Sequence, residues 1–202
     1  MLLRNKLYDR AIFPTTKPAI STISVGNLCV GGTGKTPHIE YLIQVLKTEF
    51  YIATLSRGYG RDSSGFLLAD TQSTANDIGD EPMQFKKKFP AVRVAVDEKR
   101  CRGIQKLVDK YPSLQAILLD DAFQHRAVTP GLSILLTDFS KLYSNDFVIP
   151  TGSLREFRAG AKRANIIIVT KCPNVLLPIE RKRLIDEIKP AAHQNVYFSS
   201  IK

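Results

Sequence analysis

The chain contains 202 residues, 44% of them hydrophobic and 24% charged, which is enough to bury one substantial core and fits a single α/β domain. The sequence lacks an apolar run of the ~18 to 20 residues that a membrane-spanning helix needs, and residues 1–20 show no export signal. Three cysteines without C-x-x-C spacing suggest neither a disulfide framework nor a zinc site, so a reducing cytosol is the expected compartment. The net charge of +10 indicates an anionic partner, such as a nucleotide, a nucleic acid or an anionic lipid surface.

The predicted elements follow one another in the order of a β-α-β protein. Residues 1–20 form a short basic lead-in, after which β-branched runs alternate with amphipathic stretches. The predicted strands are residues 20–25, 51–55, 92–96, 116–120, 133–137 and 165–170, and helical patterns occupy residues 39–46, 83–89, 98–110 and 178–188. Residues 57–65 and 149–160 are predicted long loops, and a last strand has scarcely begun where the chain ends. We therefore expect a mostly parallel sheet with helices on both faces.

A glycine-rich loop follows the first predicted strand. Residues 26–37 read GNLCVGGTGKTP and lead into a helical pattern, which is the order of a phosphate-binding P-loop. Lys35 would reach the outer phosphates of a nucleotide, and the Thr36 hydroxyl would hold Mg²⁺. The standard motif has a glycine where this chain has Cys29, so the later glycines must supply the flexibility. ATP or GTP binding is predicted, and an ordinary turn that caps a helix is the alternative; the predicted nucleotide-binding residues are Gly31, Gly32, Thr33, Gly34, Lys35 and Thr36.

Two pairs of acidic residues stand at positions suited to phosphate transfer. Asp120 and Asp121 end an apolar strand, where doubly wound sheets bind ligands, and could hold the Mg²⁺ of a nucleotide directly or through water. Asp80 and Glu81 precede a helical pattern, and a carboxylate near the γ-phosphate could accept the proton of an acceptor hydroxyl. Each pair also has a simpler interpretation, because acids that end a strand can be solvated and acids at a helix start complement the helix dipole.

Arginines and one histidine complete the candidate site. Residues 56–61 (SRGYGR) and 150–158 (PTGSLREFR) pair arginines with glycines in the predicted long loops, where a mobile arginine could close over a γ-phosphate. Taken alone, both segments would be interpreted as solvated surface. His125 follows the acidic pair and could contact the γ-phosphate or orient a carboxylate.

The motifs occur in a specific order along residues 21–172: SVGNLxVGGTGKTP, SRGYGR, GDEP, DDAFQHR, GxLRE and VTK. In that order they resemble the tetraacyldisaccharide 4'-kinase family. The resemblance implies a P-loop NTPase-like α/β kinase of lipid A biosynthesis, which uses ATP and Mg²⁺ to phosphorylate the 4'-hydroxyl of a tetraacyldisaccharide 1-phosphate. It also implies peripheral attachment to the cytoplasmic face of the bacterial inner membrane, with this chain soluble by itself.

The same resemblance implies roles for single residues. Asp80 would be the catalytic base, His125 and Arg155 would face the transferring phosphate, and Mg²⁺ and its waters would be served by Thr36, Glu81, Asp120 and Asp121. Family members usually begin with a hydrophobic membrane-docking segment and continue into a C-terminal portion that carries a histidine paired with the catalytic aspartate. We therefore expect a fragment, in which residues 1–20 follow the membrane segment and residues 21–202 form the P-loop nucleotide-binding kinase domain.

Two other functions are compatible with the sequence. A P-loop GTPase or metallochaperone would share the phosphate loop and the acidic strand end, although no aspartate follows Lys171 at the spacing of a guanine-reading motif. A non-catalytic basic binding module would explain the charge, but no nucleic-acid fold signature is visible, and nucleic acid is not an expected partner. The sequence leaves the oligomeric state open.

Overall fold

A computed structural model describes residues 2–200, which form one sheet of eight strands. The strands are β1 (Ser21–Asn27), β2 (Ile52–Ser56), β3 (Leu67–Leu68), β4 (Arg93–Val96), β5 (Ala116–Asp120), β6 (Leu132–Asp138), β7 (Ile166–Cys172) and β8 (Asn195–Ser200). Their order is β3-β4-β2-β5-β1-β6-β7-β8, and every neighbouring pair is parallel except β3 and β4. Because β5 and β6 both flank β1, the chain direction across the sheet reverses there, and the carboxyl ends of those strands are where such sheets bind ligands.

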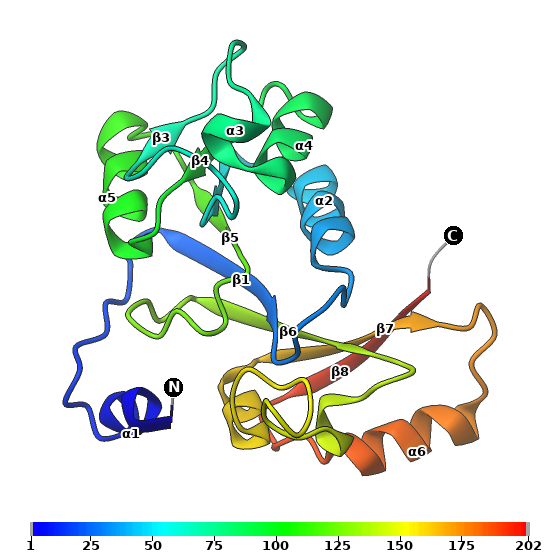
Figure 1. Ribbon diagram of the computed structural model, residues 1–202. Coiled ribbons are helices and arrows are strands. Elements are labelled where there is room, and N and C mark those ends of the chain that lie inside the picture. The colour runs from blue at the N-terminus through cyan, green and yellow to red at the C-terminus, as the bar shows by residue number, and fades with distance from the viewer. Residues whose placement is uncertain (1, 201–202) are drawn as a thin grey trace.

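Helices cover both faces of the sheet, as predicted (Figure 1). They are α1 (Leu2–Asp9), α2 (Lys35–Leu46), α3 (Ala75–Ile78), α4 (Asp80–Lys88), α5 (Arg100–Lys110) and α6 (Pro178–Ile188), with 3-10 helices at Tyr143–Asn145 and Arg158–Arg163. α2 and α4 pack on one face through a core that contains Ile43 and Phe85, and α5 packs on the other through Ile104 and Leu107. A third core, to which α6 contributes Leu184, lies under β6 and β7.

The central strands are buried on both faces, which explains their apolar sequence. In β5, Ile117 and Leu119 pack in the α5 core, whereas Leu118 between them packs in the α2 core, and each is at most 1% exposed. A parallel strand between two helical layers alternates faces without reaching water, so its sequence is apolar throughout. Burial of each such side chain stabilises the fold by about 2 kcal/mol.

The predicted strands and helices are confirmed, with ends that shift by a few residues. β5 and α6 have the bounds that the sequence pattern predicts. The expectation that the last strand has scarcely begun was wrong, because β8 pairs with β7 from Asn195 to Ser200. The periodicity did not predict α1, β3 or α3, which are short elements.

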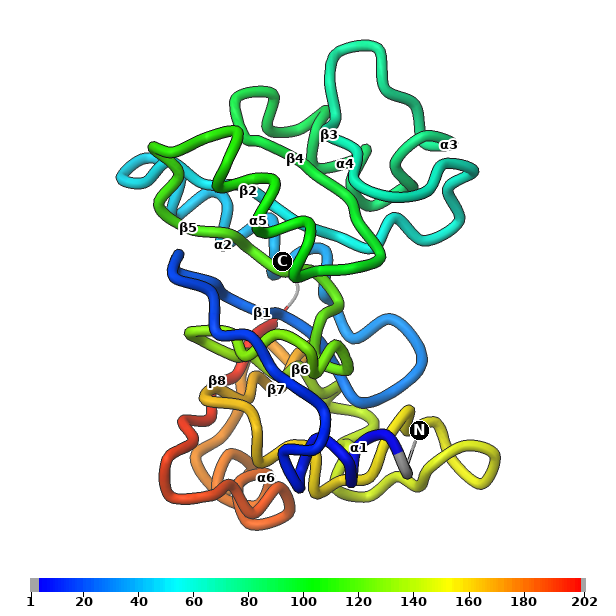
Figure 2. Tube along the Cα trace, turned by 90° about the vertical axis from the view of Figure 1, so that its left-hand side faces the viewer, coloured from blue at the N-terminus to red at the C-terminus, as the bar shows by residue number. Residues whose placement is uncertain are grey.

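α1 lies beside the loop that follows β6, although the two segments are far apart in the sequence (Figure 2). Asn5 donates a hydrogen bond from Nδ2 to Glu156 Oε2 at 2.9 Å. Arg126 forms an ion pair with Asp9 at 2.7 Å, and its guanidinium lies 5.3 Å from the ring centre of Tyr8. These polar contacts hold α1 against the loops that follow β5 and β6. No helix of residues 2–200 combines the length and the hydrophobicity that crossing a membrane requires.

Candidate active site

The phosphate loop (residues 26–37) comprises the end of β1, the turn after it and the start of α2, at the carboxyl edge of the sheet. Gly31 and Gly34 have φ angles of 118° and 82°, which glycine adopts without steric cost. Over the described residues, no side chain caps the N-terminus of α2, so the N–H groups of its first turn stay available for an anion. The predicted order of strand, loop and helix is confirmed, whereas phosphate binding by this loop stays a prediction.

Asp120 ends β5 as a buried carboxyl group that is 3% exposed. Ser56, at the end of β2, donates from Oγ to Asp120 Oδ2 at 3.2 Å. Burial raises the pKa of Asp120 to about 7, and repulsion from Glu81 and Asp121 adds to the rise. A carboxyl group with this pKa is about half protonated near neutral pH, and a bound cation would favour its ionised form.

Arg100 lies beneath the acidic residues, and its role was not predicted from the sequence. The side chain is 2% exposed and donates to the main-chain oxygens of Asp120 at 3.0 Å and of Asp97 at 2.6 Å. Burial lowers the pKa of Arg100 to about 10, which still leaves the guanidinium charged at neutral pH. Arg100 therefore supplies a fixed positive charge under the end of β5.

Asp121 joins the phosphate loop to Arg155. Its carboxylate lies 3.8 Å from Lys35 Nζ and accepts a hydrogen bond from Arg155 Nη1 at 2.9 Å. The residue has a φ of 45°, a left-handed conformation that costs a non-glycine residue about 1 to 2 kcal/mol. The structure thus brings three predicted site residues into contact, and the strained turn is held by these contacts.

Arg155 belongs to the arginine loop (residues 146–163), which is attached to the phosphate loop by backbone hydrogen bonds. Arg155 N donates to Leu28 O at 2.7 Å, and Val30 N donates to Ser153 O at 2.8 Å. The next residue, Glu156, is 4% exposed and accepts from Arg163 Nη2 at 2.7 Å. The interpretation of residues 150–158 as solvated surface holds at the two ends of the segment, which are exposed, but is wrong for Leu154 and Glu156, which are buried.

Asp80 and Glu81 begin α4, and both are exposed. A Cβ atom on Gly79 would lie 2.8 Å from Tyr59 O, so the glycine lets the helix start directly against the loop after β2. Glu81 is close enough to Asp120 to raise the pKa of that carboxyl group. Within residues 2–200, no hydrogen bond or ion pair joins Asp80 to another side chain, so its role as the base stays a prediction.

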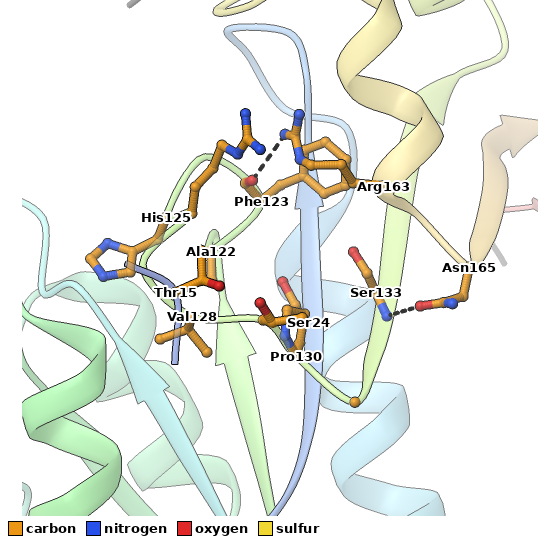
Figure 3. A pocket seen from close by; sticks show the side chains of 13 residues that line it. Thr15, Ser24, Ala122, Phe123, His125, Val128, Pro130, Ser133, Arg163 and Asn165 are labelled. Carbon is orange, nitrogen blue, oxygen red and sulfur yellow. Dashed lines mark hydrogen bonds between the residues drawn. The ribbon is translucent and has the colours of Figure 1, made fainter. Parts of the chain in front are cut away.

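His125 lines a cavity of about 290 Å³ between the acidic loop (residues 120–131), β1 and β6 (Figure 3). Burial lowers the pKa of His125 to about 4, and the neighbouring Arg100 guanidinium adds to this effect. The imidazole is therefore neutral at pH 7, and it could act on a phosphate only as a hydrogen-bond donor. In Figure 3 the ring points away from Phe123 and Arg163. The predicted contact of His125 with a phosphate stays a prediction.

The acidic residues fit a partial magnesium site. Across the described part of the chain, no three His, Cys, Asp or Glu side chains form a ready-made metal site. In phosphate-transfer sites, Mg²⁺ usually keeps several waters and takes one or two carboxylates together with phosphate oxygens. The raised pKa of Asp120 and the buried Oδ1 of Asp121, which accepts no hydrogen bond from the described residues, are consistent with that arrangement.

Known proteins resemble this chain in sequence and in fold. The family model described as "Tetraacyldisaccharide-1-P 4'-kinase" (LpxK) matches residues 1–197. The chain belongs to this family. Its sequence is 51% identical to a tetraacyldisaccharide 4'-kinase of Bacteroides thetaiotaomicron over 99% of this chain and 53% of that protein. It is also 51% identical to one of Flavobacterium johnsoniae over 98% of this chain and 58% of that protein.

A solved structure shows the same fold. It is described as the "apo" form of LpxK from Aquifex aeolicus in complex with ATP, and it matches with a TM-score of 0.75 and 26% identity over 98% of this chain and 76% of that chain. The P-loop NTPase-like α/β fold and the family expected from the ordered motifs are thus confirmed. The chain spans about half the length of the curated relatives that it matches.

Proposed function

We propose that the protein represented by this chain transfers the γ-phosphate of ATP to the 4'-hydroxyl of a tetraacyldisaccharide 1-phosphate, in the biosynthesis of lipid A. The observation that carries the proposal is the contact of Lys35, Asp121 and Arg155 at the carboxyl edge of β1 and β5. Two cations and a carboxylate from three separate loops meet where such sheets bind nucleotides. The family, and a relative crystallised with ATP, support this function.

The positively charged groups would stabilise the phosphates of ATP. Lys35 and the N–H groups at the start of α2 would bind the outer phosphates, and Arg155 would bind the γ-phosphate during transfer. Mg²⁺ would neutralise phosphate charge when it is bound, and its protein ligands would be drawn from Thr36, Glu81, Asp120 and Asp121. Phosphate transfer depends mostly on such positioning and electrostatic stabilisation.

Asp80 would accept the proton of the sugar hydroxyl. It is exposed at the first turn of α4, and its carboxylate forms no hydrogen bond or ion pair with a side chain of the described residues. An unpaired carboxylate is free to act as a base, and it would meet the acceptor from the solvent side. His125, which is neutral at pH 7, would donate a hydrogen bond to the transferring phosphate.

The acyl chains of the proposed acceptor would place the enzyme at a membrane. Peripheral contact with the cytoplasmic face of the inner membrane is therefore part of the proposal. The net charge of +10 would favour an anionic lipid surface. The GTPase alternative gains no support, because no aspartate follows Lys171 at the spacing of a guanine-reading motif.

The test combines nucleotide binding with transfer. The chain, and the longer protein that contains it, would be incubated with Mg²⁺, ATP and detergent-dispersed disaccharide 1-phosphate, and the product examined for a 4'-phosphate. Lys35→Ala should lose ATP binding, Asp80→Ala should bind ATP but lose transfer, and the exposed Lys182→Ala on α6 should match the wild type. Equal ATP affinity for Lys35→Ala and wild type would rule out the phosphate loop as the nucleotide site.

A further inference from the structure

The three loops of the site are joined twice. The direct connection runs from Lys35 through Asp121 to Arg155. A second connection lies beneath it and passes through two amide side chains, Asn27 and Gln124. We propose that Asn27 and Gln124 are positioning residues, which hold the phosphate loop and Arg155 at the spacing needed to bind the γ-phosphate. This inference rests on the proposed function.

Asn27, at the end of β1, forms hydrogen bonds with the turn of the phosphate loop. Its side chain is fully buried and donates from Nδ2 to Thr33 Oγ1 at 2.8 Å and, more weakly, to Gly31 O at 3.4 Å. A main-chain carbonyl only accepts hydrogen bonds, so the NH₂ group must face the loop. Asn27 Oδ1 is then buried with no donor from the described residues. The two hydrogen bonds of Nδ2, made from a fully buried position, point to a role of Asn27 in shaping the loop.

Gln124 carries the connection from the phosphate loop to Arg155. Its Nε2 donates to Asn27 O at 2.7 Å, and its Oε1 accepts from Arg155 Nη1 at 3.5 Å. The approach of the two loops depends on Gly26, where a Cβ atom would lie 2.7 Å from Phe123 Cβ. One side chain thus spans from the backbone of β1 to the guanidinium that also binds Asp121.

Together the contacts close a ring that begins and ends in the phosphate loop. The members of the ring, in order, are Thr33, Asn27, Gln124, Arg155, Asp121 and Lys35. In this ring a single atom of Arg155, Nη1, donates to the Asp121 carboxylate at 2.9 Å and, more weakly, to the Gln124 amide oxygen at 3.5 Å. Because ATP differs from ADP only in the γ-phosphate, misplacement of Arg155 should weaken ATP binding selectively.

The first test substitutes Gln124 by methionine, which has a similar shape and makes no comparable hydrogen bond. Isothermal titration calorimetry would measure the affinity of the chain for MgATP and MgADP. We expect Gln124→Met to weaken MgATP binding about tenfold and MgADP binding less than twofold. The matched control is Gln105→Met on α5, whose amide donates to the exposed Asp109, and it should leave both affinities unchanged.

A double-mutant cycle separates positioning from a general structural effect. Arg155→Ala should reduce the preference for ATP over ADP. Gln124→Met should cause no further loss in that background, because both changes remove the same interaction, that of Arg155 with the γ-phosphate. Additive losses, or an equal loss of both nucleotides in Gln124→Met, would overturn the inference. A wild-type chain that binds neither nucleotide would overturn the proposed function as well.

Thr33 tests the other end of the connection. Thr33→Ser keeps the hydroxyl that faces Asn27, so it should lose less MgATP affinity than the valine variant. Thr33→Val keeps the shape but removes the acceptor, and it should weaken MgATP binding about tenfold. Circular dichroism and thermal unfolding would confirm that both variants fold. Equal MgATP affinity of the serine and valine variants would contradict a role for Asn27 in shaping the loop.

Discussion

Asp146 stabilises the arginine loop, and its substitution gives a pH-dependent test of the structure. Its carboxylate is 6% exposed and accepts hydrogen bonds from Phe147 N at 2.8 Å and from Ser153 N and Oγ, while Lys141 Nζ lies 3.3 Å away. Burial alone would raise the pKa of Asp146, but the hydrogen bonds from Ser153 and Phe147 outweigh it and lower the pKa to about 2. The ionised carboxylate is therefore the form that holds the loop.

The expected effect follows from this shift. A fall in pKa from 3.8 to about 2 corresponds to about 2 kcal/mol of folding free energy at pH 7. Because the folded pKa lies below the unfolded one, this contribution is fully present above about pH 5 and is lost as the pH falls through the folded pKa. Asp146→Asn should therefore destabilise the chain by about 2 kcal/mol at pH 7 and by about half of that at pH 3.

Urea unfolding followed by circular dichroism at pH 7, 5 and 3 would measure these differences. Asp186→Asn, an exposed substitution on α6, is the matched control and should change the stability by less than about 0.5 kcal/mol at each pH. A cost for Asp146→Asn that is the same at pH 3 and pH 7 would refute the reasoning, because the loss would then come from packing and not from the charge.

Two further substitutions test the packing and charge of the site. The pKa of Asp120 is raised to about 7, so this carboxyl group binds more protons in the folded chain than in the unfolded chain between about pH 4 and 7, and its contribution to stability falls as the pH rises. Asp120→Asn should accordingly raise the urea midpoint at pH 8 in EDTA, with a smaller gain at pH 4; a loss at pH 8 would contradict this. Gly26→Ala should cost about 1 to 3 kcal/mol, because its Cβ would overlap Phe123, whereas Gly32→Ala, which meets no atom within 4 Å, should cost much less. Equal urea midpoints for these two variants would argue against the close approach of β1 to the acidic loop.

Much of the fold could be predicted because the central strands and helices have clear hydrophobic patterns in the sequence. β5 reads as an apolar run because helices cover both of its faces. α1 could not be predicted in this way, since polar contacts such as Asn5 to Glu156 hold it in place. β8 is an edge strand whose residues are all exposed or half-buried, so its sequence lacks the apolar character of the strands inside the sheet.

The candidate site was predicted in part, for a related reason. Lys35, Asp121 and Arg155 belong to residue types that carry chemistry, and the structure brings them into contact. Asn27 and Gln124 stand inside the same motifs, but a single amide gives no sign from sequence alone that it is buried or which group it binds. Their positions depend on how three loops pack together, which is a property of the tertiary structure.

The packing of these loops follows from an unusual connection between β5 and β6. The two strands lie on either side of β1, and parallel strands are usually joined by a helical crossover. Here residues 121–131 cross β1 without a helix. A crossover helix would keep the chain further from β1, because side chains of the helix would lie between the two. The helix-free loop instead lies directly on Gly26, which is why Asp121, Gln124 and Arg126 reach the arginine loop, the phosphate loop and α1 from a single short segment.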